Sequence, residues 1–154
     1  MAVASLLTAL SLHRLAFLDT NVFSYHLCDH PRYAPLSAAI LGAVESGALP
    51  ALTTTLTLAE LLTLPAKAGD AQALTDYELF LTRFPNLRLV PLDEKVAREA
   101  ALVRASTGLR TPDAIQVASA RVHKADVILS NDRKWSNCIS YPQVLLLETY
   151  ACPG

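Results

Sequence analysis

The sequence is short of cysteine, glycine and net charge, and each shortage removes a class of protein. Its 154 residues include three cysteines, widely spaced and odd in number, which predict neither a disulfide framework nor a CxxC pair. This usage fits a reducing, cytoplasmic setting. Only five glycines are present, and no glycine-rich phosphate loop follows an apolar run. The net charge of -1 gives no overall attraction to nucleic acid, so any such contact must come from a local patch.

Long apolar runs are also absent, because no stretch approaches the roughly 18 residues that span a membrane. The first residues are apolar, but basic residues follow this stretch instead of preceding it, which argues against a secretory signal. Val3, Leu6, Leu7 and Leu10 recur at helical spacing. We therefore expect residues 1–13 to form an apolar helical extension that packs on the domain or on a partner. The hydrophobic content of 52% supports a sizeable core in a single domain over residues 14–154.

Short apolar runs alternate with helical patterns along this domain. The expected strands are residues 15–18, 49–53, 87–90, 126–130 and 144–147. The expected helices are residues 22–28, 36–46, 55–64, 71–84, 94–106 and 111–124. The third of these helices should end before Pro65 and be largely buried, because it is apolar nearly all round. The alternation predicts a three-layer α/β/α sandwich whose parallel sheet has about five strands.

Four carboxylates occupy positions where such folds place ligands. Asp19 and Asp132 follow apolar strands, and open α/β sheets bind ligands at the carboxyl ends of their strands. Asp113 lies in the first turn of a helix for which we expect Thr111 to be the N-cap, and Glu60 is the one charge in an apolar helix. Simpler structural roles stay open at this point. Asp19 could be only a helix cap, and Asp113 only an ordinary acid in the first turn of a helix. Glu60 could lie on a solvent-facing stripe with Thr53, Thr57 and Thr63.

A shared pocket for these acids follows if the strands before Asp19 and Asp132 are neighbours. Four ionised carboxylates repel one another and need a counter-charge, which a hard divalent cation supplies. Oxygen ligands favour Mg²⁺ or Mn²⁺, and such a centre activates a water and stabilises charge on a phosphoryl oxygen. Neighbouring polar side chains would orient ligands, waters or phosphate oxygens; these are Thr20, Asn21, Ser130 and Asn131.

Two other chemistries have weaker support in the sequence. His26, Cys28 and His30 invite a zinc interpretation, but on a helix the cysteine points away from the face that the two histidines share. The simpler reading is a set of surface polar residues with one half-buried thiol. An aspartyl-phosphate phosphatase would need a second aspartate two residues after Asp19, where this chain has Asn21.

Four segments, in this order, resemble the PIN-domain family, and they look most like its VapC-type toxins of toxin–antitoxin pairs. The resemblance extends over roughly residues 14–148 and implies a PIN-like α/β/α fold with Mg²⁺- or Mn²⁺-dependent RNA cleavage. It assigns the metal-site and catalytic roles to the four acids named above, the fourth being more variable in role. The segments are Leu18-Asp19-Thr20-Asn21, Leu58-Ala59-Glu60-Leu61, Leu109-Arg110-Thr111-Pro112-Asp113-Ala114 and Ser130-Asn131-Asp132-Arg133.

The resemblance also implies a homodimer and a small cognate antitoxin whose tail covers the acidic pocket. The chain departs from the family in two respects. Ser130 stands where many members have threonine, which also supplies a hydroxyl, and the apolar segment before the first strand is unusually long.

Four basic residues close in sequence to the acidic segments are our candidates for contact with the RNA backbone: Arg14, Arg110, Arg133 and Lys134. The leading hypothesis is thus a metal-dependent endoribonuclease that acts as the toxin of a type II toxin–antitoxin system. Two alternatives stay open. One is a PIN nuclease of RNA maturation or DNA processing, and the other is a non-catalytic domain that binds RNA or protein.

Overall fold

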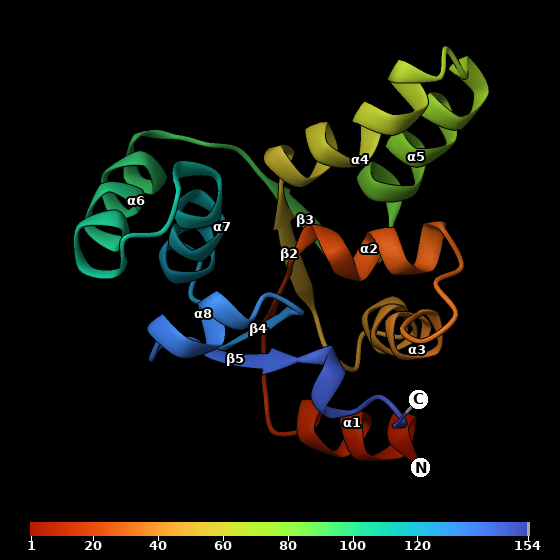
Figure 1. Ribbon diagram of the computed structural model, residues 1–154, viewed down its shortest axis with the longest axis horizontal. Helices are drawn as coiled ribbons and strands as arrows, with labels where there is room; N and C mark the ends of the chain where they lie inside the picture. The colour runs from red at the N-terminus through yellow and green to blue at the C-terminus, as the bar shows by residue number, and fades with distance from the viewer. Residues whose placement is uncertain (154) are drawn as a thin grey trace.

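Five short strands form one parallel sheet with helices on both faces (Figure 1). The computed structural model describes residues 1–153, so Gly154, the last residue of the expected domain, lies outside it. The sheet order is β3-β2-β1-β4-β5, and every neighbouring pair is parallel. The predicted three-layer sandwich is therefore confirmed. The strands are β1 (Ala16–Leu18), β2 (Ala51–Thr54), β3 (Leu87–Val90), β4 (Val127–Ser130) and β5 (Gln143–Leu146).

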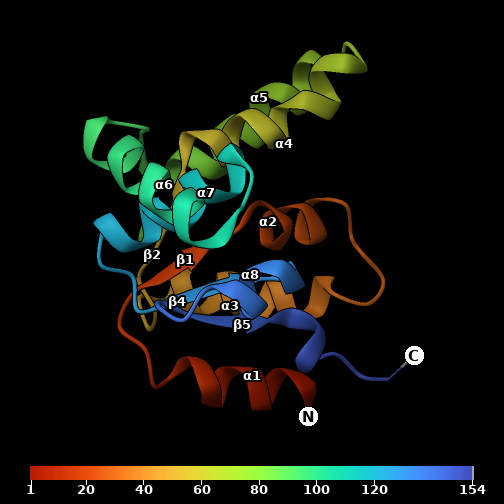
Figure 2. The same ribbon diagram turned by 60° about the vertical axis from the view of Figure 1, so that its left-hand side comes forward.

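The helices divide between the two faces of the sheet, as Figure 2 shows from a second direction. One hydrophobic core joins the sheet to α1 (Ala2–Leu10), α2 (Thr20–Leu27), α3 (Ala34–Glu45) and α5 (Ala71–Arg83). The other joins it to α6 (Glu94–Thr107), α7 (Thr111–Val122) and α8 (Arg133–Cys138). A 3₁₀ turn, η1 (Leu147–Thr149), follows β5. Within residues 1–153, no helix combines the length and the apolar character needed to cross a membrane.

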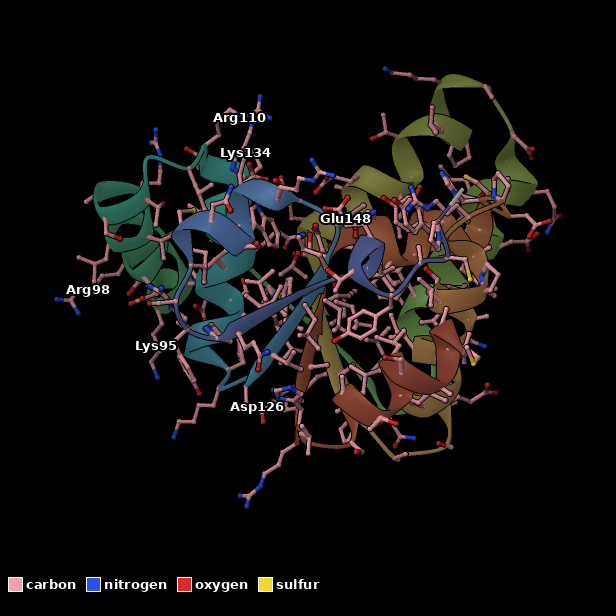
Figure 3. All side chains as sticks on the ribbon, turned by 60° about the horizontal axis from the view of Figure 1, so that its bottom comes forward. Lys95, Arg98, Arg110, Asp126, Lys134 and Glu148 are labelled. Atoms are coloured by element: carbon pink, nitrogen blue, oxygen red, sulfur yellow. The ribbon has the colours of Figure 1, made fainter. Side chains whose placement is uncertain are left out.

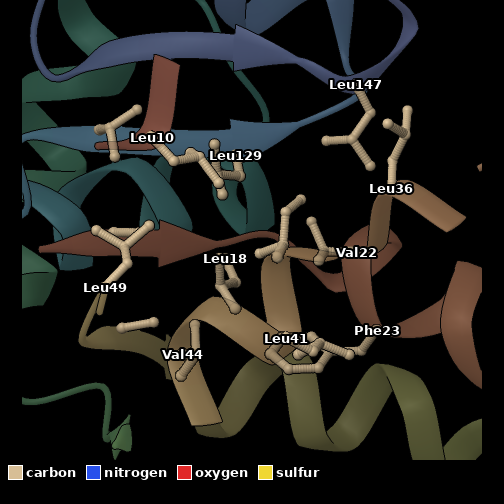
Figure 4. Close-up of a cluster of buried hydrophobic side chains, with 14 of the residues drawn as sticks. Leu10, Leu18, Val22, Phe23, Leu36, Leu41, Val44, Leu49, Leu129 and Leu147 are labelled. Carbon is tan, nitrogen blue, oxygen red and sulfur yellow. The ribbon is translucent and has the colours of Figure 1, made fainter. Parts of the chain in front are cut away.

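Strands β1 and β4 are buried on both faces, which explains their unbroken apolar sequences. Leu18 of β1 and Leu129 of β4 enter the first core, where Figure 4 shows them with the other buried leucines. Phe17 and Ile128, one residue earlier in each strand, enter the second core. All four side chains are fully buried. Alternate residues of each strand thus serve opposite cores.

The N-terminal helix α1 packs on its own domain, which is one of the two arrangements that its apolar spacing allowed. Leu6 and Leu10 are buried in the first core, and Figure 4 shows Leu10 near Leu129 of the sheet. Leu7, by contrast, is 40% exposed. The hydrophobic stripe of the helix is therefore only partly used by the domain itself.

Helix α4 (Thr55–Lys67) differs from its prediction. It was expected to end near Leu64 and to be largely buried, but it runs through Pro65 to Lys67 and Leu64 is 69% exposed. Figure 1 shows α4 and α5 extending together beyond the edge of the sheet. A proline this near the end of a helix removes only one backbone hydrogen bond, and Pro65 is itself buried. The start of α7 also differs by one residue, since Arg110 and not Thr111 is its N-cap.

The amino ends of β1 and β4 are joined by one carboxylate. Asp126 accepts hydrogen bonds from the backbone N–H groups of Arg14, at 3.1 and 3.2 Å, and of Leu15, at 3.1 Å. His13 Nδ1 lies 3.5 Å from the same carboxylate. Partial burial by itself raises the pKa of Asp126, but these N–H donors and His13 outweigh it and hold the pKa below its usual value. The chain between α1 and β1 is therefore fixed by a charged acceptor.

Replacing this acceptor tests its charge. Asp126→Asn should lower the free energy of unfolding at pH 7 by about 1–2 kcal/mol, because hydrogen bonds to a charged group become bonds to a neutral one. A carboxyl whose pKa is lowered by folding stabilises the protein above its unfolded-state pKa and loses this effect as the pH falls through the folded-state pKa. The difference between the two proteins should thus shrink in acid. Urea unfolding at pH 7 and at pH 3 measures it, with Asp29→Asn at an exposed turn as the control. An equal loss at both pH values would contradict a role for the charge.

Candidate active site

The site lies where the sheet reverses its strand order. β1 pairs with β4 in the register Leu18 to Leu129, so the residues that follow these strands emerge side by side. The backbone N–H of Asp19 donates to the carbonyl oxygen of Leu129 at 3.0 Å, and Ser130 Oγ donates to Asp19 Oδ2 at 2.6 Å. This is the switch point of an open α/β sheet, where such folds bind their ligands.

Asp19 is held in a single orientation and is nearly enclosed. Its second oxygen, Oδ1, accepts the backbone N–H of Thr20 at 2.8 Å and so caps α2. Only 8% of the residue is exposed. Burial raises the pKa of Asp19 from 3.8 to about 6, although the bonds from Ser130 and Thr20 oppose the rise. The nearby charges of Glu60 and Asp113 raise the pKa further.

Glu60 reaches the site from α4. Thr20 Oγ1 donates to Glu60 Oε1 at 3.3 Å. Burial raises the pKa of Glu60, and the charge of Asp113 adds to this effect. The simpler interpretation placed Glu60 on a solvent-facing stripe with Thr53, Thr57 and Thr63. Glu60 and Thr63 are exposed, whereas Thr53 and Thr57 are fully buried. Glu60 thus combines an exposed side chain with contacts at the edge that carries Asp19.

Asp113 and Asp132 complete the set of acids at this edge. Asp113 lies in the first turn of α7, and its pKa is raised by burial and then by the charge of Asp132. Asp132 caps α8 by accepting the backbone N–H of Lys134 at 2.9 Å, and its own N–H donates to Ser130 Oγ at 3.0 Å. Four separate elements thus bring the four sequence-predicted acids close enough for their charges to interact.

A buried polar network behind the acids is absent from the sequence interpretation. Gln116, 2% exposed, accepts from Thr54 Oγ1 at 2.6 Å and donates from Nε2 to Thr57 Oγ1 at 2.8 Å and to Thr20 Oγ1 at 3.5 Å. Thr53 Oγ1 donates to Thr57 Oγ1 at 3.0 Å. The network joins α7 to the hydroxyl that bonds Glu60. Its signal in the sequence is one amide on an otherwise apolar helix face, together with a run of threonines.

Asn131 ties three elements together beside the acids. Its Nδ2 donates to Tyr25 Oη on α2 at 3.1 Å, and its Oδ1 accepts the backbone N–H of Glu148 in η1 at 2.9 Å. Burial raises the pKa of Tyr25, and the charges of Asp19 and Glu148 contribute to the rise. Both ends of the Asn131 amide are therefore occupied by the protein, and Tyr25 is a residue of this edge that the sequence did not indicate.

The candidate basic residues do not all reach this edge. Arg110 and Lys134 lie near Asp113, where their charges lower its pKa and partly offset the effect of burial. Arg133 is engaged in a two-pronged ion pair with Glu148, at 2.6 and 2.8 Å. Arg14 lies at the amino end of β1, the opposite edge of the sheet, beside Asp126. The structure thus places two of the four candidates beside one of the acids.

The donors at the site suit a hard divalent cation. All four acids offer carboxylate oxygens, and Asn21 Oδ1 is a buried acceptor without a hydrogen-bond partner. Within residues 1–153 no three acidic, histidine or cysteine side chains converge into a ready-made cage. Mg²⁺ binds through one or two carboxylates, because it keeps several of its waters. The side chains that could hold such a cation are those of Asp19, Glu60, Asp113 and Asp132, whose charges act on one another.

The alternative zinc ligands do not come together. The His26 ring stacks on Phe80 with a centroid distance of 5.8 Å. His30 Nδ1 accepts the backbone N–H groups of Arg32, at 3.1 Å, and Tyr33, at 3.2 Å. Cys28 is exposed. These residues are separate polar groups, as the simpler interpretation expected, but the thiol is exposed and not half-buried.

Comparison with known proteins agrees with the geometry. The family model described as PIN domain matches residues 16–138. No curated protein matches the chain in sequence. Among solved structures, a chain of FitAcB from Neisseria gonorrhoeae has a TM-score of 0.67 at 22% identity, covering 86% of this chain and 98% of that one. A chain of VapBC2 from Rickettsia felis, bound to a DNA fragment from its promoter, has a TM-score of 0.67 at 18% identity, covering 85% and 96%. A toxin–antitoxin complex from Klebsiella pneumoniae gives 0.65 at 17%, covering 86% and 97%.

The electrostatic cost of Asp19 can be measured in the absence of metal. Because folding raises the pKa of this acid to about 6, its ionised form destabilises the protein above that pH, and the penalty vanishes below 3.8, where folded and unfolded chains are both protonated. A pKa difference of this size corresponds to at most about 3 kcal/mol. Asp19→Asn should therefore raise the melting temperature in EDTA at pH 8 but not at pH 3.5. Asp70→Asn, at the exposed cap of α5, is the control, since asparagine caps helices as well as aspartate does. A variant that is less stable than wild type at pH 8 would contradict an uncompensated charge.

The network around Gln116 should contribute measurably to stability. Gln116→Met keeps the length of the side chain but leaves the hydroxyls of Thr54 and Thr57 short of a partner, so the free energy of unfolding should fall by about 2 kcal/mol. The same substitution at exposed Gln72, whose Nε2 bonds Asp76 at 2.8 Å, is the matched control and should cost under about 0.5 kcal/mol. Denaturant unfolding of both variants measures these two losses of free energy. Equal losses would show that the Gln116 bonds are not worth more than surface ones.

Proposed function

This chain belongs to the PIN-domain family, and on that premise we propose that it is a Mg²⁺- or Mn²⁺-dependent endoribonuclease that acts as the toxin of a toxin–antitoxin pair. The observation that carries the proposal is the gathering of four acids, from β1, α4, α7 and β4, at the switch point of the sheet. Among them Asp19 is buried and its pKa is raised to about 6. Carboxylates that repel one another lower the stability of the fold, so their presence together favours a functional role.

Each residue has a role that its contacts support. Asp19 and Asp113 would hold the cation, and the bonds from Thr20 and Ser130 fix the direction of both Asp19 oxygens. When bound, the cation lowers the pKa of a water and offsets charge on a phosphoryl oxygen. Glu60, which accepts a hydrogen bond from Thr20 Oγ1, would orient a water and accept its proton. Asp132 donates its backbone N–H to the same Ser130 hydroxyl that bonds Asp19, and it lies near Asp113.

A nucleic-acid substrate is supported by the cations beside the acids. Arg110 and Lys134 lie near Asp113, and neither is neutralised by an ion pair among the described residues. They would bind the phosphates that flank the scissile one. RNA, and in particular unpaired RNA, is our choice of substrate because single strands offer phosphates that can bend into an acidic edge.

We also propose a small antitoxin as a partner and a homodimer as the working form. The solved structures reported above as similar in fold include complexes of toxins with antitoxins. The chain exposes apolar residues that such contacts would cover, among them Leu64 on α4 and Leu79 on α5, which are 69% and 42% exposed. Both lie on the pair of helices that extends beyond the sheet (Figure 1).

The test is cleavage of total cellular RNA by the purified protein in Mn²⁺ or Mg²⁺, against EDTA. Discrete fragments should appear only with metal. Asp19→Asn and Asp113→Asn should each lower the rate at least about a hundredfold, because each removes a charged ligand from the site. Mn²⁺ should also raise the melting temperature of wild type and not of Asp19→Asn, which gives a readout besides activity.

Asp93→Asn is the matched control for these variants. Asp93 caps α6 by accepting the N–H of Val96 at 2.9 Å, and its charge acts on His123 at the carboxyl end of α7, whereas Asp113 lies at the amino end. Cleavage by this variant should equal that of wild type. Metal-independent cleavage, or full activity in Asp19→Asn, would refute the proposed nuclease.

A further inference from the structure

The two sides of the acidic edge differ in charge. On the α6–α7 side, next to Asp113, lies an open cavity of about 440 Å³, a size that small-ligand pockets commonly have. Arg110 and Lys134 line it together with Asp113, Asn137 and Cys138. Figure 3 shows the side chains of Arg110 and Lys134 close together and apart from Glu148.

The geometry of this cavity is set by the turn between α6 and α7. Gly108 adopts a left-handed conformation with φ of 73° as it ends α6. Arg104 Nε then donates to the carbonyl oxygen of Leu109 at 3.2 Å, and Leu109 N–H donates to Thr107 Oγ1 at 3.2 Å. Arg110 follows directly. The backbone of Arg110 is thus fixed while its side chain stays exposed. The guanidinium group is therefore free to bind a ligand.

The cavity on the other side of the acids is lined by no such cation. A smaller cavity of about 170 Å³ lies beside Thr20 and Glu60, and its remaining lining is largely apolar, including Leu61 and Tyr77, with Cys28 at its wall. In the part of the chain that the structure describes, no lysine or arginine lines it. Arg133, the next residue along the chain from Asp132, is neutralised by Glu148 at 2.6 and 2.8 Å.

We infer that the cavity lined by Arg110, Lys134 and Asn137 binds the nucleotide next to the scissile phosphate, so that a single-stranded RNA crosses the acids toward α6 and α8. The inference rests on the proposed function and specifies the path of its substrate. Arg110 and Lys134 hold the neighbouring phosphate, where they offset the repulsion between that phosphate and Asp113. Asn137 offers an amide that both donates and accepts, which suits a base edge.

Binding by charge variants tests the path. The probe is a fluorescently labelled, unstructured 12-nucleotide RNA of mixed sequence, measured by anisotropy with Ca²⁺ in place of Mg²⁺. Arg110→Ala and Lys134→Ala should each raise the Kd about fivefold. Each should also reduce the slope of log K against log salt by about 0.7, the value for one lost contact with a single strand. Arg133→Ala is the matched control from the same helix, and its Kd should stay within about twofold of wild type.

The cysteines of the chain provide a footprint that does not depend on any substitution. All three are exposed: Cys138 in the basic cavity, Cys28 in the apolar one, and Cys152 in a third cavity between α1 and the C-terminal segment. Saturating RNA should slow the alkylation of Cys138 by N-ethylmaleimide and leave the rates at Cys28 and Cys152 unchanged. Mass spectrometry of the labelled peptides gives the three rates in one sample.

The outcomes separate this path from the proposed nuclease. Protection of Cys28 in place of Cys138, or an Arg133→Ala effect as large as that of Lys134→Ala, would overturn the path. If wild type cleaves RNA in Mn²⁺ while Arg110→Ala and Lys134→Ala bind it normally, the path fails and the nuclease stands. If wild type neither binds nor cleaves RNA, both fail. Protection of Cys138 by a poly-glutamate peptide to the same extent as by RNA would assign the cavity to an acidic protein partner. That result would also overturn the path.

Discussion

The parallel pairing of β1 with β4 is the constraint on which the site depends. The register aligns Leu18 with Leu129, and packing on both faces fixes it, since alternate residues of each strand enter opposite cores. A slip of one residue would exchange every side chain between the cores. The bond from Ser130 to Asp19 is a consequence of this register, because each of these residues directly follows one of the aligned leucines. The position of the acids is therefore determined by apolar packing beneath them.

The groups that donate hydrogen bonds to the acids are neutral and not cationic, so the negative charge of the acids is not cancelled. Asp19 receives its bonds from a serine hydroxyl and a backbone N–H, and Glu60 from a threonine hydroxyl. A lysine or arginine inside the cluster would neutralise it and occupy the place of a metal ion. The cations near the acids, Arg110 and Lys134, are instead exposed at one side. The arrangement keeps the carboxylates fixed while leaving their charge available.

Much of this architecture could be predicted because its signals are local. Unbroken apolar runs indicated the buried strands, and residues 87–90 form β3 as expected. Asp70 and Asp93 cap their helices, as an aspartate directly before a helix commonly does. The four acids were recognisable because each stood at a strand end or alone in an apolar helix. These features depend on neighbours in sequence, which a single chain displays directly.

The parts that could not be predicted depend on tertiary contacts. Helix α4 continues through Pro65 because α5 packs beside it, so a local helix-breaking rule was overridden. Gln116 is a hub only because β2 and α2 bring threonines to it from far away in the sequence. Arg14 is near Asp19 along the chain, yet the strand between them carries it to the opposite edge of the sheet. Nearness in sequence to an acidic motif is thus a weak guide to nearness in space.

The structural and functional explanations of the aspartates are compatible, although the sequence presented them as alternatives. Asp19 caps α2 with one oxygen while the other faces Ser130, and Asp132 caps α8. Capping places a carboxylate at the start of a helix, where the unpaired N–H groups hold it and favour its ionised form. A cap at the carboxyl end of a strand is therefore already an oriented anion at the edge where ligands bind. Around such a position, one further acid on each neighbouring element is enough to gather carboxylates at this edge, as Glu60 and Asp113 do here.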